Sequence, residues 1–105
     1  MIYSKDFSNL CKKYNFSTIP STAGVDFIGF EIENKTDFFT IGMYHRDAYF
    51  CWLYDGIVLN YFTNEFHRTK CNTIEEFEKG LQNAVLLKKQ LLIKMKIDEI
   101  EKGFK

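Results

Sequence analysis

Apolar and polar residues alternate along four segments between residues 25 and 63, and this alternation predicts strands of one β-sheet. Asp55-Gly56 stands between two such segments and is the strongest hairpin signal in the chain, because Asp-Gly readily supplies the positive φ angles of a type I′ turn. Further turns are expected at Lys35-Thr36 and Arg46-Asp47. The pattern therefore predicts a four-stranded antiparallel meander.

Pairing the strands about these three turns brings apolar and aromatic side chains together on one face of the sheet. A slip of one residue would mix this set with polar residues such as Glu31 and Thr40, since successive side chains of a strand point to opposite faces. We therefore expect the register that keeps one face apolar. That face would consist of Ile28, Phe30, Ile32, Phe39, Ile41, Met43, Phe50, Trp52, Tyr54, Ile57, Leu59 and Tyr61.

A short helix is predicted near the amino terminus. Ser4 can act as its N-cap, and Asn15 can end it, because asparagine tolerates the left-handed conformation in which helices often stop. Between these positions one apolar stripe is formed by Phe7, Leu10, Cys11 and Tyr14. Residues 15–24 contain the chain's single proline and are predicted to be a connecting loop.

A long helix is predicted for the carboxy-terminal part of the chain. Thr73 and Glu76 have the spacing of a capping box, and Gly80 is expected to allow close packing on the sheet. One arc of the helix is apolar and should cover the apolar face of the sheet. It contains Ile74, Phe77, Leu81, Ala84, Leu91, Leu92 and Met95.

The same helix carries a second apolar stripe on its other side, with the spacing of a helix–helix seam. A helix that is apolar on two sides has to bury both of them. The second stripe is therefore expected to pack either on the amino-terminal helix or on a copy of itself in a homodimer. Its members are Leu86, Ile93, Ile97, Ile100 and Phe104.

These elements predict an α+β protein with one domain over residues 1–105: a short amino-terminal helix, a four-stranded meander and a long carboxy-terminal helix packed on one face of the sheet. Fourteen basic residues balance fourteen acidic residues, so net charge gives no preference for nucleic acid or anionic membranes. The first residues lack the features of a signal peptide, and the apolar runs are far shorter than a membrane span. We expect a cytoplasmic protein that does not bind membranes.

The residues that commonly carry chemistry do not form a recognisable motif. The three cysteines are odd in number and lack CxxC spacing, which predicts free thiols. Only His67 and Cys71 are close in sequence; no second pair stands at metal-ligand spacing, and a His67–Cys71 pair would lack a third group to orient it. In the predicted register Cys51 and His45 lie on opposite faces of the sheet, which excludes a nucleophile–base pair between them. The glycines form no phosphate-binding loop. We therefore expect no enzyme activity, no cofactor and no metal.

The sheet face opposite the predicted core carries acidic and aromatic residues, and either the amino-terminal helix covers it or it contacts another molecule. The candidate partner-binding residues on it are Glu31, Glu33, Phe38, Tyr44, Tyr49 and Phe62. Residues 25–55 hold six acidic against two basic residues, which favours a basic protein partner. The same excess weighs against the alternative, a single-stranded nucleic-acid-binding protein that uses sheet aromatics.

The function expected from the sequence is therefore that of a non-enzymatic protein-binding module. Lysine outnumbers arginine twelve to two, and alanine is rare, as in proteins from low-GC genomes. Small size, low-GC composition and an acidic aromatic surface together suggest an inhibitor from a phage or mobile element that docks on a host protein, for example a defence nuclease.

Overall fold

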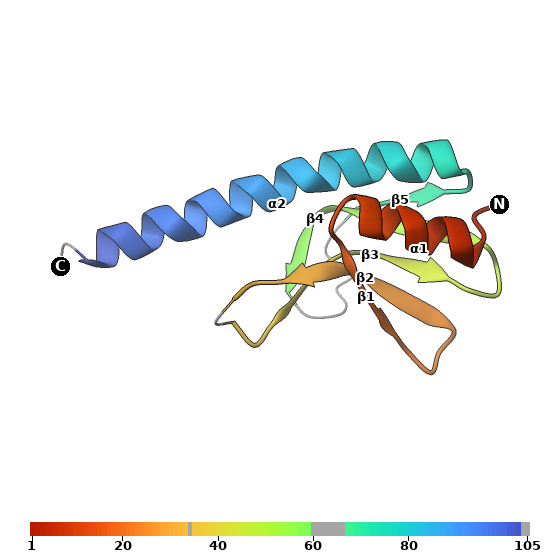
Figure 1. Cartoon of the computed structure of the whole chain (residues 1–105), viewed down its shortest axis with the longest axis horizontal. Helices are drawn as coiled ribbons and strands as arrows, with labels where there is room; N and C mark the ends of the chain where they lie inside the picture. The colour runs from red at the N-terminus through yellow and green to blue at the C-terminus, as the bar shows by residue number, and fades with distance from the viewer. Residues whose placement is uncertain (34, 60–66, 104–105) are drawn as a thin grey trace.

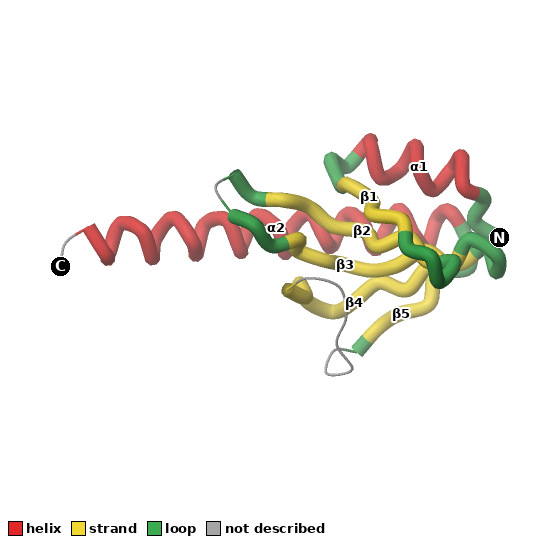
Figure 2. The backbone as a smooth tube through the Cα atoms, turned by 90° about the horizontal axis from the view of Figure 1, so that it is seen from below, coloured by secondary structure: helices red, strands yellow, loops and turns green. Residues whose placement is uncertain are grey.

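The structure is a computed structural model, which describes residues 1–33, 35–59 and 67–103. The elements follow one another as α1 (Ser4–Lys13), β1 (Ser17–Pro20), β2 (Val25–Glu31), β3 (Phe38–His45), β4 (Phe50–Leu59), β5 (Arg68–Cys71) and α2 (Ile74–Gly103). The strands form one antiparallel sheet in chain order. The two helices lie side by side on one face of it (Figures 1 and 2). The predicted α+β architecture is confirmed, with five strands in place of four.

Both helices begin and end largely as their sequences indicate. At the start of α2 the Thr73 hydroxyl accepts a hydrogen bond from the amide of Glu76, and the Glu76 carboxylate accepts one from the amide of Thr73, which completes the predicted capping box. Asn15 adopts a φ of 60° just beyond α1, as expected for a left-handed helix end. The N-cap of α1 is Tyr3 rather than Ser4, and no side chain caps this helix.

The first strand lies in the segment that was expected to be a loop. β1 pairs with β2 along its whole length, from Ser17 opposite Gly29 to Pro20 opposite Asp26. It is an edge strand, and an edge position tolerates proline because an outward-facing amide is not needed for the ladder. The loop prediction gave too much weight to the proline and to the short polar residues around it.

The predicted hairpin at Asp55-Gly56 is wrong, because β4 runs on through this dipeptide. Residues 54–57 stand opposite Ile41 alone, between the pairs Leu53–Gly42 and Val58–Thr40, so the extra residues form an irregular bulge. Neither Asp55 nor Gly56 is among the described residues with a positive φ, which a type I′ turn would require. The chain instead turns back beyond β4 and returns as β5.

A second irregularity places part of the sheet on the opposite face from that predicted, whereas Ile28, Phe30, Phe39 and Ile41 face the core as expected. Ile28 pairs with Gly42 but Gly29 pairs with Thr40, so Ile41 is an extra residue in β3. One inserted residue moves all later side chains of the strand to the other face. Among the apolar residues predicted to face inward, those beyond the bulge therefore face away from the helices: Met43, Phe50, Trp52 and Tyr54.

The core lies between the helices and the sheet. Phe77 and Leu81 of α2 are fully buried in it, together with Phe7 and Cys11 of α1, and the sheet contributes Ile28, Phe30, Phe39, Ile41, Tyr44, Cys51, Leu53 and Cys71. Gly80 lies directly over Leu53, so that a Cβ atom at this position would overlap the Leu53 Cδ1. The expectation that Gly80 permits close packing of helix and sheet is confirmed.

Candidate binding surfaces

Tyr44 was expected on a partner-binding surface, but it is one of the most deeply buried residues of the protein. Its exposed fraction is 0%, its ring stacks on Phe7 at 4.2 Å between centroids, and its hydroxyl donates a 2.7 Å hydrogen bond to the carbonyl oxygen of Ile2. The bulge at Ile41 is the cause, because it turns Tyr44 toward the helices. Tyr44 thus fixes the amino terminus to the sheet, and the expectation that it contacts a partner is wrong.

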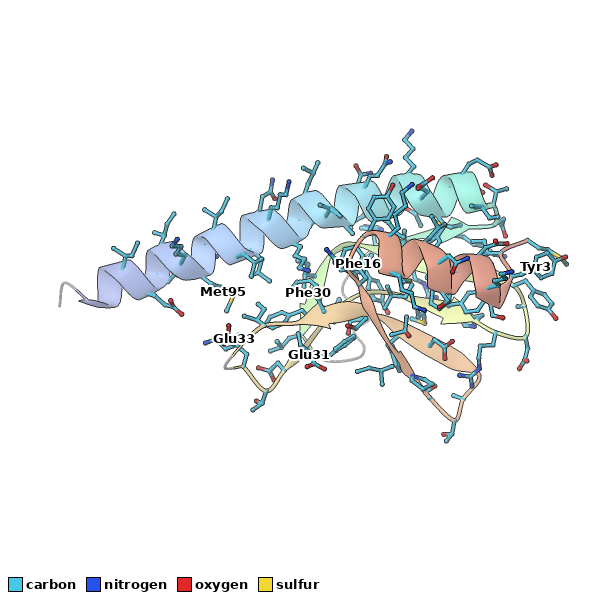
Figure 3. The ribbon with its side chains drawn as sticks, viewed as in Figure 1. Tyr3, Phe16, Phe30, Glu31, Glu33 and Met95 are labelled. Atoms are coloured by element: carbon cyan, nitrogen blue, oxygen red, sulfur yellow. The ribbon has the colours of Figure 1, made fainter. Side chains whose placement is uncertain are left out.

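The other residues expected on that surface are not brought together. Phe38 is buried, and Tyr49 lies in the β3–β4 turn with a φ of 58° and its ring 5.3 Å from that of Tyr3. Glu31 and Glu33 are exposed at the far end of β2 (Figure 3). Phe62 lies outside the described residues. The acidic aromatic face therefore does not exist as predicted, and α1 does not cover the outer face of the sheet, since it lies beside α2 (Figure 2).

The cysteines are free, buried thiols, as expected. Burial is the main cause of a raised pKa at all three thiols. With a smaller contribution from the charge of Asp26, it raises the pKa of Cys11 to about 12, and with one from Glu76 it raises that of Cys71 to about 11. A thiol is nucleophilic only as the thiolate, so these values disfavour nucleophilic chemistry near neutral pH. Cys51 and His45 lie on opposite faces of the sheet, as the sequence indicated, although each is on the face predicted for the other.

A cavity beside α2 could hold a small ligand, whereas the described residues offer no metal site. No group of three or more His, Cys, Asp and Glu residues within the described ranges is arranged to hold a metal ion. A cavity of about 620 Å³ opens between α2 and strands β4 and β5, where Glu76, Lys79 and Asn83 of the helix face Leu53 and Thr69. Its wall mixes two acidic groups, one basic group and two amides with apolar side chains, and it contains no histidine. It carries no catalytic arrangement that we recognise.

The carboxy-terminal half of α2 extends well past the end of the sheet (Figure 1). The helix has 30 residues, and the molecule is 51 Å long but only 27 and 24 Å across. Ile93 is 61% exposed and Ile97 49%, and Leu86 and Ile100 are similarly exposed. These four residues, which we call the α2 stripe, all belong to the predicted helix–helix seam; its last member, Phe104, lies outside the described residues.

The amino-terminal helix does not cover the α2 stripe, so this alternative for the second side of α2 is wrong. α1 contacts α2 nearer its start, where Glu78 accepts hydrogen bonds from Lys13 Nζ at 2.7 Å and the Tyr14 hydroxyl at 2.8 Å. Gln82 in turn donates to the Tyr14 oxygen at 3.1 Å. The bonds from Lys13, and then from Tyr14, lower the pKa of Glu78. These contacts end one turn before the stripe begins at Leu86.

Sequence reasoning missed a group of residues on the outer face of the sheet. Trp52 and Phe50 project there from β4, with the cations Arg68 and Lys70 of β5 beside them. β5 was not predicted because it is short and mostly polar, and the two aromatics had been assigned to the core. The isolated glycines Gly29 and Gly42 within predicted strands were the available signal, since such glycines often mark a bulge.

Comparison with protein-family models, with curated proteins and with solved structures gave no match. Among the described helices, none has the length and apolar character needed to cross a bilayer.

Proposed function

We propose that this chain is a non-enzymatic protein-binding module and that it binds through the α2 stripe. The observation that supports this most strongly is the exposure of four large apolar side chains on one side of a helix that extends past its own domain. Single exposed apolar residues are common on protein surfaces, but several on one side of the same helix typically mark a contact surface.

We further propose that the stripe is occupied by a second copy of the chain, paired antiparallel. Lys88 and Lys89 precede the midpoint of the stripe at Ile93, and Asp98 and Glu99 follow it. An antiparallel pair places the basic part of one helix beside the acidic part of the other, whereas a parallel pair would place like charges together. Ile93 then lies at the centre of the interface, and Ile97 lies one turn away from it.

The energy available suits a reversible dimer. Each stripe residue has about half of its side chain left to bury, which is worth roughly 1 kcal/mol, so two helices together contribute about 8 kcal/mol. This is comparable to the several kcal/mol that association costs in lost translational and rotational freedom. The dimer should therefore depend strongly on any one pair of stripe residues.

The narrower hypothesis of an inhibitor that binds a basic host protein stays a prediction. It was based on a single acidic aromatic surface, and the burial of Tyr44 and Phe38 removes that surface. Glu31 and Glu33 remain exposed, but Tyr44 and Phe38 do not lie on the surface beside them.

Sedimentation equilibrium tests the proposal. The wild-type chain should be dimeric at about 100 µM, and the double variant Ile93→Glu/Ile97→Glu should be a folded monomer, because four buried carboxylates would meet at the interface. Leu92→Glu is the matched control, since it introduces the same group about 100° around the helix from Ile93 and should leave the dimer intact. A monomeric wild type, or a double variant that remains dimeric, would overturn the proposal; circular dichroism confirms that each variant folds.

A further inference from the structure

The outer face of the sheet carries a patch that the protein-binding proposal does not use. We call it the aromatic–cationic patch, and it comprises His45, Phe50, Trp52, Tyr54, Arg68 and Lys70. Cross-strand pairing builds it, with His45 opposite Phe50, Trp52 opposite Lys70 and Tyr54 opposite Arg68. Both helices lie on the other face of the sheet, so neither covers it (Figure 2).

The aromatic rings form a connected surface. The imidazole of His45 stacks on Phe50 at 4.6 Å, and Phe50 meets Trp52 edge to face at 5.7 Å. Trp52 and Phe50 are each only partly buried. A partly exposed aromatic ring is a surface on which an unstacked base can stack.

Two cations lie directly beside these rings. The Arg68 guanidinium is 4.3 Å from the Trp52 ring centroid, and Lys70 Nζ is 4.4 Å from that of Phe50. Neither is in an ion pair among the described residues, where the bridges are Lys13–Glu78 and Arg46–Asp26. Their charges therefore remain available to an anion. The charge next to the exposed aromatics is thus positive, opposite to the acidic excess expected from the sequence.

Two polar atoms of the patch have no hydrogen-bond partner within the part of the chain that the structure describes. They are the hydroxyl of Tyr54, a residue only 6% exposed, and Nε2 of His45. A buried polar group left without a partner typically costs about 1–3 kcal/mol, so native proteins rarely retain one without a ligand or function. Burial raises the pKa of Tyr54, so its hydroxyl keeps its proton. Burial lowers the pKa of His45, and the positive charges of Arg68 and Lys70 lower it further. The imidazole is therefore neutral at pH 7.

We propose that the aromatic–cationic patch binds single-stranded nucleic acid. A base stacks on Trp52, and phosphates pair with Arg68 and Lys70. The Tyr54 hydroxyl and His45 Nε2 supply hydrogen bonds to base edges or sugar hydroxyls. An acidic protein segment would use the two cations, but it has no flat rings to stack on the aromatics and no need of the neutral polar atoms; an oligonucleotide uses all three kinds of group.

Trp52 is the only tryptophan of the chain, so its fluorescence reports directly on stacking. Titration with a single-stranded oligothymidine of about twelve nucleotides, a length within the site sizes of known binders, should quench it. Two phosphate contacts predict that log K falls against log salt concentration with a slope of about −1.4, since each neutralised phosphate contributes about −0.7 on single strands. An abasic oligomer of the same length and polyglutamate should each bind at least tenfold more weakly.

Variants assign the binding to the patch. Arg68→Gln/Lys70→Gln should weaken binding at least tenfold and reduce the salt slope nearly to zero, whereas Lys5→Gln/Lys12→Gln, which removes two exposed charges from α1, should change neither. Tyr54→Phe should weaken binding several-fold without lowering the melting temperature, because its hydroxyl has no hydrogen-bond partner among residues 1–33, 35–59 and 67–103. Any of three results overturns the proposal. Oligothymidine does not quench the fluorescence of Trp52; polyglutamate or the abasic oligomer binds as tightly as oligothymidine; or the two double variants lose the same amount of affinity.

Discussion

Gly42→Ala is expected to destabilise the protein by more than about 3 kcal/mol, a large part of the 5–15 kcal/mol that holds a typical domain folded. A Cβ atom on Gly42 would overlap the backbone carbonyl oxygen of Trp52 and lie 2.7 Å from Leu53 Cδ2. A backbone atom cannot move aside without opening the pairing of β3 with β4. Urea denaturation followed by circular dichroism measures the loss.

Gly80→Ala is the matched control for this prediction. Its Cβ atom would meet only the end of the Leu53 side chain, which can rotate, and alanine gains about 1 kcal/mol of helix propensity over glycine. The net loss should therefore be clearly smaller than for Gly42→Ala. Equal stability of the Gly42 variant and the wild type would show that β3 and β4 do not approach each other as the structure has them.

Tyr44→Ala is expected to cost about 3–5 kcal/mol, the range for removing a large aromatic side chain from a core. The change leaves a cavity beside Phe7 and takes away the hydrogen bond to the carbonyl of Ile2. Tyr44→Phe keeps the ring and should cost only about 1 kcal/mol, which separates the hydroxyl from the packing. Thermal and urea unfolding of the three proteins provide the comparison.

The contrary result has a definite meaning. If Tyr44 were the exposed contact residue that strict alternation predicts, its replacement by alanine would change stability by less than about 0.5 kcal/mol. Such an outcome would return Tyr44 to the protein surface and contradict the reversal of the sheet faces at Ile41.

The features that were predictable from the sequence are those fixed by neighbours in the chain. The Thr73–Glu76 capping box, the end of α1 at Asn15 and the sheet-facing arc around Phe77 all depend on residues within a few positions of one another. They do not change when a distant strand shifts. The apolar side of α2 that forms the α2 stripe was also predictable, because its residues are only a few positions apart on one helix.

The face of a strand beyond a bulge was not predictable in this way, because it depends on every residue between two pairing positions; before the bulge, Ile28, Phe30 and Phe39 face the core as predicted. A single extra residue at Ile41 reversed the assignment of Tyr44 and Trp52, and with it the predicted binding surface. The apolar residues of this sheet fill both faces almost equally well, so the hydrophobic pattern alone did not reveal the bulge. Arg68 and Lys70 could be recognised as partners of the aromatics only once β5 had been placed.

The two proposed surfaces are compatible with each other. The α2 stripe lies on the helical side of the molecule, whereas the aromatic–cationic patch lies on the outer face of the sheet (Figures 1 and 2). A dimer formed through α2 would therefore present two patches, and an oligonucleotide long enough to reach both would bind more tightly than one that fills a single patch. Ile93→Glu/Ile97→Glu should abolish this length dependence while leaving binding of short oligonucleotides unchanged.

Which face of the sheet is buried can be measured directly from the reactivity of Cys51 toward a maleimide, mapped by mass spectrometry of the native protein at pH 7.5. Cys51 lies under the helices with a raised pKa, so it should stay unlabelled for as long as the protein remains folded and react at the rate of a free thiol once urea unfolds the chain. Rapid labelling of Cys51 in the folded protein would place Cys51 on the outer face of the sheet and Trp52 beneath the helices. That result would contradict both the inward position of Tyr44 and the aromatic–cationic patch.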